Sequence, residues 1–214
     1  SGNTGISNPI YVTMNSFMGC YCIPSNSSGC GFSDVINNVT LGTLNNTTGC
    51  TSTPSYIDYG GSVSAPSLSI GTTYPMSVAV GPGGTENVGV WIDYNQSGTF
   101  DASEYTYLGT GNGVTITNNI TIPATALAGT TKMRVRVRYS SSIASTDACT
   151  GFAYGEAEDY NVTLVCPTLS LSSSPSSTAV CSGGNATFSA SGSGAGLTYQ
   201  WQENTGSSWV NITN

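Results

Sequence analysis

Short runs in which apolar and polar residues alternate recur along the chain, and they predict strands rather than helices. Each run is bounded by Gly, Pro, Asn or Asp residues that favour turns, and no stretch keeps a helical period. The runs begin at Val35, Ser62, Pro75, Asn87, Gly113, Thr131 and Asp159. Their spacing is typical of a sandwich or barrel, so the predicted fold class is all-β, with a β-sandwich as the first domain.

The run from Lys132 to Tyr139 is the clearest of these strands. Basic side chains at Lys132, Arg134, Arg136 and Arg138 alternate strictly with Met133, Val135, Val137 and Tyr139. One face of the strand is therefore cationic, and the other belongs to the core. These four residues are all the Lys and Arg of the chain. We expect a solvated sheet face paired with neighbouring carboxylates; a recognition surface for an anionic ligand is the alternative.

The character of the sequence changes at Cys166, where a Ser-rich segment poor in charge follows the last predicted strand. We place a domain boundary there. Residues 166–214 contain Cys181 followed by Trp201, an order found in immunoglobulin-like sandwiches. We expect them to be the N-terminal part of such a domain, cut short at Asn214. Residues 22–165 are predicted to form the first sandwich, and residues 1–21 a leading segment or the end of a preceding domain.

The charge balance narrows the classes of partner. The chain has 4 basic and 11 acidic residues and a net charge of −7. Nucleic acid is excluded as a predicted partner because its binding depends on a basic face that neutralises phosphates. The acidity suits a cation ligand instead. Only 7% of the residues are charged, and Gly, Ser, Thr and Asn dominate, which is typical of extracellular all-β proteins.

The chain has 7 cysteines and no histidine. This pattern indicates disulfides in an oxidising compartment, because a zinc site made of cysteines alone would need two close pairs. The pairing stays open: Cys22 with Cys30 would close a short loop, and Cys50 with Cys149 would join distant strands. Since the count is odd, we expect Cys181 to lack its partner. No apolar run is long enough to span a bilayer, so a secreted or cell-surface location is expected.

A calcium loop is predicted at Asp93–Glu104, which reads DYNQSGTFDASE. Loops of this type supply oxygens from positions 1, 3, 5, 7, 9 and 12 and place Gly at position 6, which here is Gly98. The predicted Ca²⁺ ligands are Asp93, Asn95, Ser97, the backbone carbonyl of Thr99, Asp101 and Glu104. Ser97 departs from the usual Asp or Asn, and the loop follows a strand. A polar turn closed by Asx-type hydrogen bonds is the alternative.

A second acidic cluster lies in YGEAEDY, before the last strand of the first domain. If Tyr160 faces inward, strand parity puts Glu156 and Glu158 on the same side, where carboxylates need partners. We expect salt bridges of Glu156, Glu158 and Asp159 to the basic strand. A contribution to a cation site near Asp93 and the hydrolysis of glycosides are the alternatives.

The same motif carries a family resemblance. The matching features are the Cys149 segment and the sequences YC, VWIDYNQSGTF, IPATALAGTTKMRVRVRY and YGEAEDYNV, with Ala157 where the motif has Val. With them, residues 22–165 resemble the GEVED domain, a β-sandwich module of secreted and cell-surface bacterial proteins. Residues from Cys166, including SGGNATFSASGSGAGLTYQWQ, resemble immunoglobulin-like repeats of large Bacteroidota adhesins. These resemblances imply modules of a long exported chain, often delivered by type IX secretion, without enzymatic activity.

No sequence motif of an enzyme is present: the chain has no histidine, no GxSxG elbow and no Gly-rich phosphate loop. The predicted function is therefore a non-catalytic, calcium-stabilised, disulfide-tied segment of a modular adhesin or surface filament. Its expected partners are other modules of the same chain and surface glycans. The alternative is a carbohydrate-binding accessory module of a secreted hydrolase. Its candidate sugar-stacking residues are Tyr94, Tyr105, Tyr107, Tyr139 and Tyr154.

Overall fold

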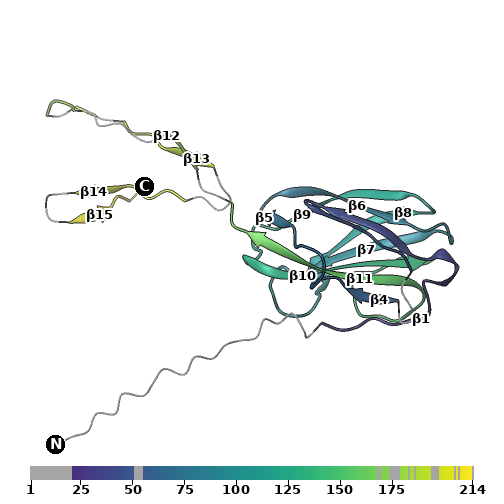
Figure 1. Cartoon of the computed structure of the whole chain (residues 1–214). Helices are drawn as coiled ribbons and strands as arrows, with labels where there is room; N and C mark the ends of the chain where they lie inside the picture. Colours follow the sequence, from purple (N-terminus) through teal and green to yellow (C-terminus); the bar gives the residue numbers. More distant parts are fainter. Residues whose placement is uncertain are drawn as a thin grey trace, which may run out of the picture.

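The computed structural model describes residues 21–50, 55–167, 170–173, 179–182, 184–185, 187–193, 198–204, 206 and 208–213 (Figure 1). Strands dominate these residues. Their helical turns are two short 3-10 segments, η1 (Gly31–Ser33) and η2 (Ala102–Glu104). The all-β class predicted from the alternation is confirmed.

Two sheets form the first unit. One has the order β1-β11-β10-β7-β8, with β4 and β5 also paired to β11, and the other has the order β3-β2-β6-β9. One apolar core takes side chains from both sheets, so the predicted β-sandwich is confirmed. The strands are β1 (Asn26–Gly29), β2 (Ile36–Leu41), β3 (Leu44–Thr47), β4 (Tyr56–Asp58), β5 (Ser67–Ser69), β6 (Thr73–Val80), β7 (Glu86–Ile92), β8 (Tyr105–Gly111), β9 (Thr115–Thr121), β10 (Gly129–Tyr139) and β11 (Phe152–Val165).

Strand β11 joins the distant parts of the larger sheet. One edge pairs antiparallel with β10, from Gly129 opposite Leu164 to Arg138 opposite Gly155. The other edge pairs in parallel with β1, then β4, then β5. Parallel neighbours need long crossover connections, so their pairing is not visible in local alternation. The last strand of the unit thus fixes three segments from its beginning.

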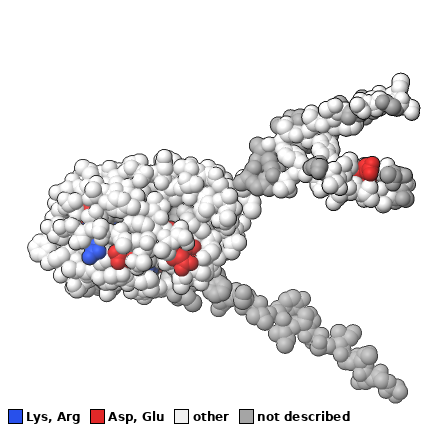
Figure 2. All heavy atoms as spheres, turned by 180° about the vertical axis from the view of Figure 1, so that it is seen from behind, with Lys and Arg blue, Asp and Glu red and all other residues white. Residues whose placement is uncertain are grey.

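The cationic face of β10 is buried at Lys132, Arg134 and Arg136, and half-buried at Arg138. Arg134 and Arg136 are 0% exposed and Lys132 is 3% exposed, while Met133, Val135 and Val137 pack in the core on the opposite face. The view in Figure 2 accordingly shows little blue at the surface. The prediction of a solvated face is wrong, because residues 21–33 and 140–152 cover this side of the sheet and contact its arginines.

Two disulfides tie the first unit, Cys22–Cys149 and Cys30–Cys50. Neither of the pairings considered from the spacing forms. The reason is topological: β1 runs parallel beside the start of β11, which brings Cys22 to the segment before Phe152. Among the described residues Cys166 and Cys181 are both exposed and outside any disulfide, as expected for Cys181.

Among the described residues after β11, four short strands form two antiparallel pairs. Strand β12 (Ser170–Ser173) pairs with β13 (Ser191–Ser193), and β14 (Gln202–Asn204) pairs with β15 (Trp209–Asn211), both antiparallel. The boundary at Cys166 and the immunoglobulin-like character of residues 166–214 stay predictions. The leading segment predicted at residues 1–21 lies, except for Tyr21, outside the described residues. A helix with the length and apolarity to span a bilayer is absent from the described residues.

Candidate functional site

The predicted calcium loop connects β7 to β8. It begins where the backbone amide of Asp93 donates to the carbonyl of Lys132 at 3.0 Å, and it ends in η2. Asp93 is 0% exposed and Glu104 is 4% exposed, although both are acidic. Gly98 has a φ of 82°, the left-handed conformation that a sharp turn at this position requires. The first and last acids of the loop therefore both turn inward.

Backbone amides of the loop converge on these two carboxylates. Asp93 Oδ1 accepts the amide of Ser97 at 3.0 Å, and Asp93 Oδ2 accepts the amide of Gly98 at 2.9 Å. The hydroxyl of Tyr21 also donates to Asp93 Oδ2, at 2.5 Å. Glu104 accepts the amide of Asn95 at 3.3 Å and that of Asp101 at 2.9 Å. Asp93 thus holds the middle of the loop, and Glu104 holds its two flanks.

The remaining predicted ligands belong to the same hydrogen-bonded ring. Asn95 Nδ2 donates to Asp101 Oδ2 at 3.1 Å, and Asn95 Oδ1 accepts the Ser97 amide at 2.9 Å. The hydroxyls of Ser97 and Thr99 lie 2.9 Å apart. The fold therefore brings all the predicted ligands into one loop, and the Asx-type hydrogen bonds of the alternative interpretation are present as well.

The donor types of the loop suit calcium. Carboxylate, amide, hydroxyl and carbonyl oxygens are the ligands that this ion takes. Burial raises the pKa of Glu104, the amides of Asp101 and Asn95 oppose this, and the negative charges of Asp93 and Asp101 add to it. In the described part of the chain no three acidic, Cys or His side chains are close enough to hold a metal together. A bound ion would therefore depend on Asn95, Ser97 and the Thr99 carbonyl as well.

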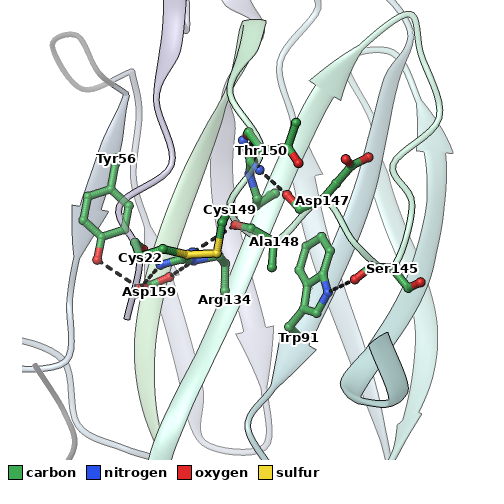
Figure 3. The surroundings of a disulfide bond; sticks show 11 residues. Cys22, Tyr56, Trp91, Arg134, Ser145, Asp147, Ala148, Cys149, Thr150 and Asp159 are labelled. Atoms are coloured by element: carbon green, nitrogen blue, oxygen red, sulfur yellow. Dashed lines mark hydrogen bonds and ion pairs between the residues drawn. A yellow bond between two sulfur atoms is a disulfide. The ribbon is translucent and has the colours of Figure 1, made fainter. Parts of the chain in front are cut away.

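On the buried face of the sheet, Arg134 of β10 contacts β11 and both covering segments, residues 21–33 and 140–152 (Figure 3). Its Nε and Nη2 donate to the two oxygens of Asp159, each at 2.7 Å. The same side chain donates to the carbonyls of Cys22 at 2.7 Å and Ala148 at 2.9 Å. Tyr56 completes the group by donating to Asp159 at 2.9 Å. The two charges are paired, and Arg134 Nη1 also donates to the sulfur of Cys22, which belongs to the Cys22–Cys149 disulfide, at 3.1 Å.

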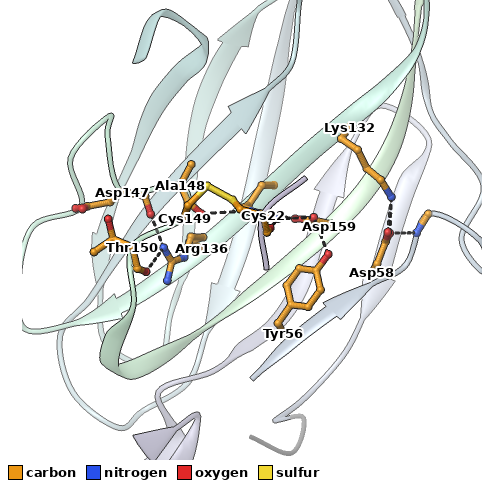
Figure 4. A network of polar contacts seen from close by, with 12 residues as sticks. Cys22, Tyr56, Asp58, Lys132, Arg136, Asp147, Ala148, Cys149, Thr150 and Asp159 are labelled. Carbon is orange, nitrogen blue, oxygen red and sulfur yellow. Dashed lines mark hydrogen bonds and ion pairs between the residues drawn. A yellow bond between two sulfur atoms is a disulfide. The ribbon is translucent and has the colours of Figure 1, made fainter. Parts of the chain in front are cut away.

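Arg136 and Arg138 hold the 140–152 segment by its carbonyl oxygens (Figure 4 shows Arg136). Arg136 Nη1 donates to the carbonyls of Asp147 and, at 2.8 Å, Thr150, and Arg138 Nη1 donates to that of Ser142 at 2.9 Å. Both guanidinium groups lie over the ring of Phe152, at 4.0 and 4.3 Å. Burial, with the positive charge of Arg134 nearby, lowers the pKa of Arg136 to about 9. We call Arg134, Arg136 and Arg138 with these carbonyls the arginine clamp.

Two aromatic side chains of the same sheet face assist the clamp. Trp91 Nε1 donates to the carbonyl of Ser145 at 2.9 Å, and the Tyr105 hydroxyl donates to that of Ile143 at 2.6 Å. Trp91 also packs with Ile143, Ala148 and Phe152 in a second, smaller apolar cluster outside the main core. The alternation in the sequence pointed to one buried face of this sheet, but both faces are buried.

Gly89 makes room for this cover, and its substitution gives a prediction. A Cβ at Gly89 would lie 2.5 Å from Ile143 Cγ2 and 2.9 Å from Tyr105 Cε2. We expect Gly89→Ala to lower the free energy of unfolding by about 1–3 kcal/mol, since the segment must shift. Gly31→Ala, where a Cβ meets nothing within 4 Å, is the control and should change it by less than about 0.5 kcal/mol. Urea unfolding measures both, and equal losses would contradict the packing described.

The acidic cluster of β11 divides between the two faces of the sheet. Glu156 and Glu158 are both 0% exposed and share the core side, as parity predicted, whereas Asp159 faces the arginines. Glu156 accepts the amide of Ile36 at 2.9 Å, and Glu158 accepts the hydroxyl of Tyr160 at 2.7 Å. Burial raises the pKa of Glu158 to about 7. The expected arginine partners are therefore correct for Asp159 and wrong for the two glutamates.

The alternatives for this cluster find no support in the geometry. The residue opposite Lys132 on β11 is Asn161, and the backbone carbonyl of Lys132 accepts the backbone amide of Asp93. Glu158 is thus three residues, about 10 Å along the strand, from the level of the 93–104 loop. Because Glu156 and Glu158 are wholly buried, no surface is available for a sugar to approach them.

Sequence reasoning missed the partners that lie far away in the chain. Asp58 accepts from Lys132 Nζ at 2.6 Å, and Asp147 lies 3.6 Å from Arg138. The equal spacing of the basic residues was a usable signal, since four cations on one face of one strand require acceptors within reach. Nothing in the local sequence identified which acceptors they were.

The comparison with known families bears on the same region. Residues 87–163 match the model of the GEVED domain. No curated protein matches the chain. The matched residues run from β7 to β11 and so include the 93–104 loop, the arginine clamp and Asp159. Over these residues the chain is similar to the GEVED domain.

Proposed function

We propose that this chain is a non-catalytic, calcium-stabilised segment of a modular extracellular adhesin or surface filament. One observation carries the proposal: every Lys and Arg of the chain lies on β10 and holds the protein's own segments. Because these side chains are bonded to the protein's own segments, they stabilise its fold and do not serve a reaction. The two disulfides and the GEVED similarity fit an extracellular module.

The parts of the sandwich that are hardest to stabilise are its irregular segments. The carbonyl oxygens of Ala148 and Thr150 lie where water has little or only partial access, and Arg134 and Arg136 satisfy them. The Cys22–Cys149 bond fixes the same segment covalently to the start of the unit. This construction suits a module that must keep its shape outside the cell.

Calcium would complete the stabilisation at the 93–104 loop. The residues that would hold it are Asp93, Asn95, Ser97, Thr99 through its carbonyl, Asp101 and Glu104. The support is the burial of Asp93 and Glu104 without a basic side chain beside them, since all Lys and Arg side chains have other partners. When bound, the ion would supply positive charge that offsets the cost of burying both carboxylates.

Removal of calcium tests this part of the proposal. If calcium is present at about 100 times its dissociation constant, it adds about 2.7 kcal/mol of stability. For a chain of this size that corresponds to a rise in Tm of about 5–10 °C relative to chelator. The shift should disappear in Glu104→Gln and persist in Asp58→Asn, where the altered acid lies outside the loop. Melting curves of the wild-type chain that superpose with and without chelator would contradict calcium binding.

The second candidate is a carbohydrate-binding accessory module. Two of its five candidate tyrosines favour it, since Tyr107 and Tyr139 are each 42% exposed. Tyr105 does not, because its hydroxyl is bound to Ile143 and its ring packs on Trp91. Saturable binding on a glycan array that a single Tyr→Ala change abolishes would favour this function over the structural one.

Export by type IX secretion belongs to the first proposal and rests on the resemblance of residues 166–214.

A further inference from the structure

A pocket of about 340 Å³ lies near the start of β7 and the end of β10, away from the calcium loop and the arginine clamp. Its lining residues are Phe32, Asp34, Gly83, Tyr139 and Tyr154. They come from η1 and the residue after it, from the turn between β6 and β7, and from the facing ends of β10 and β11. The calcium-stabilised structural function proposed above uses none of them, although Tyr139 and Tyr154 are also candidates of the carbohydrate-binding alternative.

Three aromatic rings form the walls of this pocket. The ring of Tyr154 meets that of Phe32 at 5.9 Å between centroids and that of Tyr139 at 6.2 Å, both edge to face. Phe32 is 81% exposed, and with Ser33 it holds positive φ angles of 62° and 70°. Bulky residues adopt this conformation at a cost, so the exposed ring is maintained by its surroundings and not by burial.

The floor of the pocket is acidic. Asp34 is 2% exposed, and its Oδ1 has no hydrogen-bond partner. Glu86, which is 0% exposed, lies beside Asp34. Burial, followed by the hydrogen bond with Asp34 and its negative charge, raises the pKa of Glu86 to about 9, so Glu86 is protonated at neutral pH.

The chain itself offers no cation to this pair. It has four basic residues and no histidine, and all four lie on the opposite face of β10 with partners of their own. A buried carboxylate oxygen without any partner is unfavourable, and a bound cation would satisfy it.

We propose that this pocket binds an alkylammonium group, the chemistry shared by a lysine side chain and a small primary amine. Ring faces attract a cation, and Asp34 accepts hydrogen bonds from a group that has three donors and no acceptor. A sugar fits less well, because the edge-to-face rings present no flat platform and the lining has no basic donor for sugar oxygens. The site is independent of calcium and of the function proposed above.

Titration of the intact chain with n-butylammonium, followed by NMR chemical shifts, tests the proposal. We expect saturable binding, with a dissociation constant on the order of millimolar and shifts around Phe32, Tyr139 and Tyr154. n-Pentanol, which is similar in shape and uncharged, should bind at least about tenfold more weakly. Nα-acetyl-lysine-N-methylamide should bind at least as well as n-butylammonium if the natural source is a protein side chain, and more weakly if it is a free amine; either result supports the site.

Matched variants separate the pocket from non-specific effects. Asp34→Asn keeps the shape of the floor and should weaken butylammonium binding by about tenfold, and Tyr139→Leu by about threefold or more. Tyr107→Leu is the control, since Tyr107 is as exposed as Tyr139 (42% each) and lies outside the pocket. Melting curves verify that each variant is folded. Absence of saturation in the wild type, equal affinity for pentanol, or equal losses in the two Tyr variants would overturn the proposal.

Discussion

Asp159→Asn is expected to lower the free energy of unfolding by about 3–5 kcal/mol, the loss that follows when one partner of a buried ion pair is removed. Arg134 and Asp159 have side chains that are 0% and 1% exposed, and two hydrogen bonds of 2.7 Å join them. The amide has the size of the carboxylate but no charge, so the guanidinium of Arg134 stays buried without a counterion. Urea unfolding with the disulfides intact measures the difference.

The control for this prediction is the same chemical change on the neighbouring pair. Asp58 pairs with Lys132 at 2.6 Å on the same sheet face, but its side chain is 39% exposed. Water can replace the lost carboxylate there, and Asp58→Asn should cost only about 1 kcal/mol. If the two variants lose equal stability, the burial of the Arg134–Asp159 pair is not what makes it important.

Removal of the Cys22–Cys149 disulfide has the second large expected effect. The bond closes 127 residues, and the chain-entropy relation gives about 5 kcal/mol for a loop of this length. The Cys30–Cys50 bond spans 20 residues, for which the same relation gives about 3 kcal/mol. We therefore expect Cys22→Ser with Cys149→Ser to destabilise the chain more than Cys30→Ser with Cys50→Ser. Denaturant unfolding of the two double variants measures the order.

A local readout accompanies the global one. Cys22 accepts hydrogen bonds from Arg134 through its carbonyl at 2.7 Å and its sulfur at 3.1 Å. Loss of its disulfide should therefore loosen residues 140–152 and increase proteolytic cleavage there, whereas loss of Cys30–Cys50 should not. The opposite order of stability, or cleavage in both variants alike, would contradict the role assigned to this bond.

The alternation of β10 predicted the strand, its two faces and the inward turn of Met133, Val135 and Val137. These properties depend only on the fact that successive side chains of a strand point to opposite faces of the sheet. The same logic placed Glu156 and Glu158 on one side of β11. What alternation cannot show is whether a polar face is covered, because the covering residues 21–33 and 140–152 lie far from β10 in sequence or beyond its end.

The predicted calcium loop shows a different limit of the sequence. Its oxygen-bearing residues and Gly98 were identified by spacing, and the fold does gather them around Asp93 and Glu104. Spacing alone does not show whether the two carboxylates bind an ion or only accept hydrogen bonds from the backbone amides of the loop. The pocket beside Asp34 had no sequence signal at all, since Phe32, Gly83, Tyr139 and Tyr154 belong to four segments that only tertiary packing brings together.

The basic side chains of β10 support the protein's own fold and do not form a binding surface. Labelling of arginines by phenylglyoxal, read by mass spectrometry, tests it most directly. In the folded chain we expect Arg138, whose side chain is 32% exposed, to react, and Arg134 and Arg136, both 0% exposed, to react only after unfolding. Reaction of all three at similar rates in the folded protein would contradict the account.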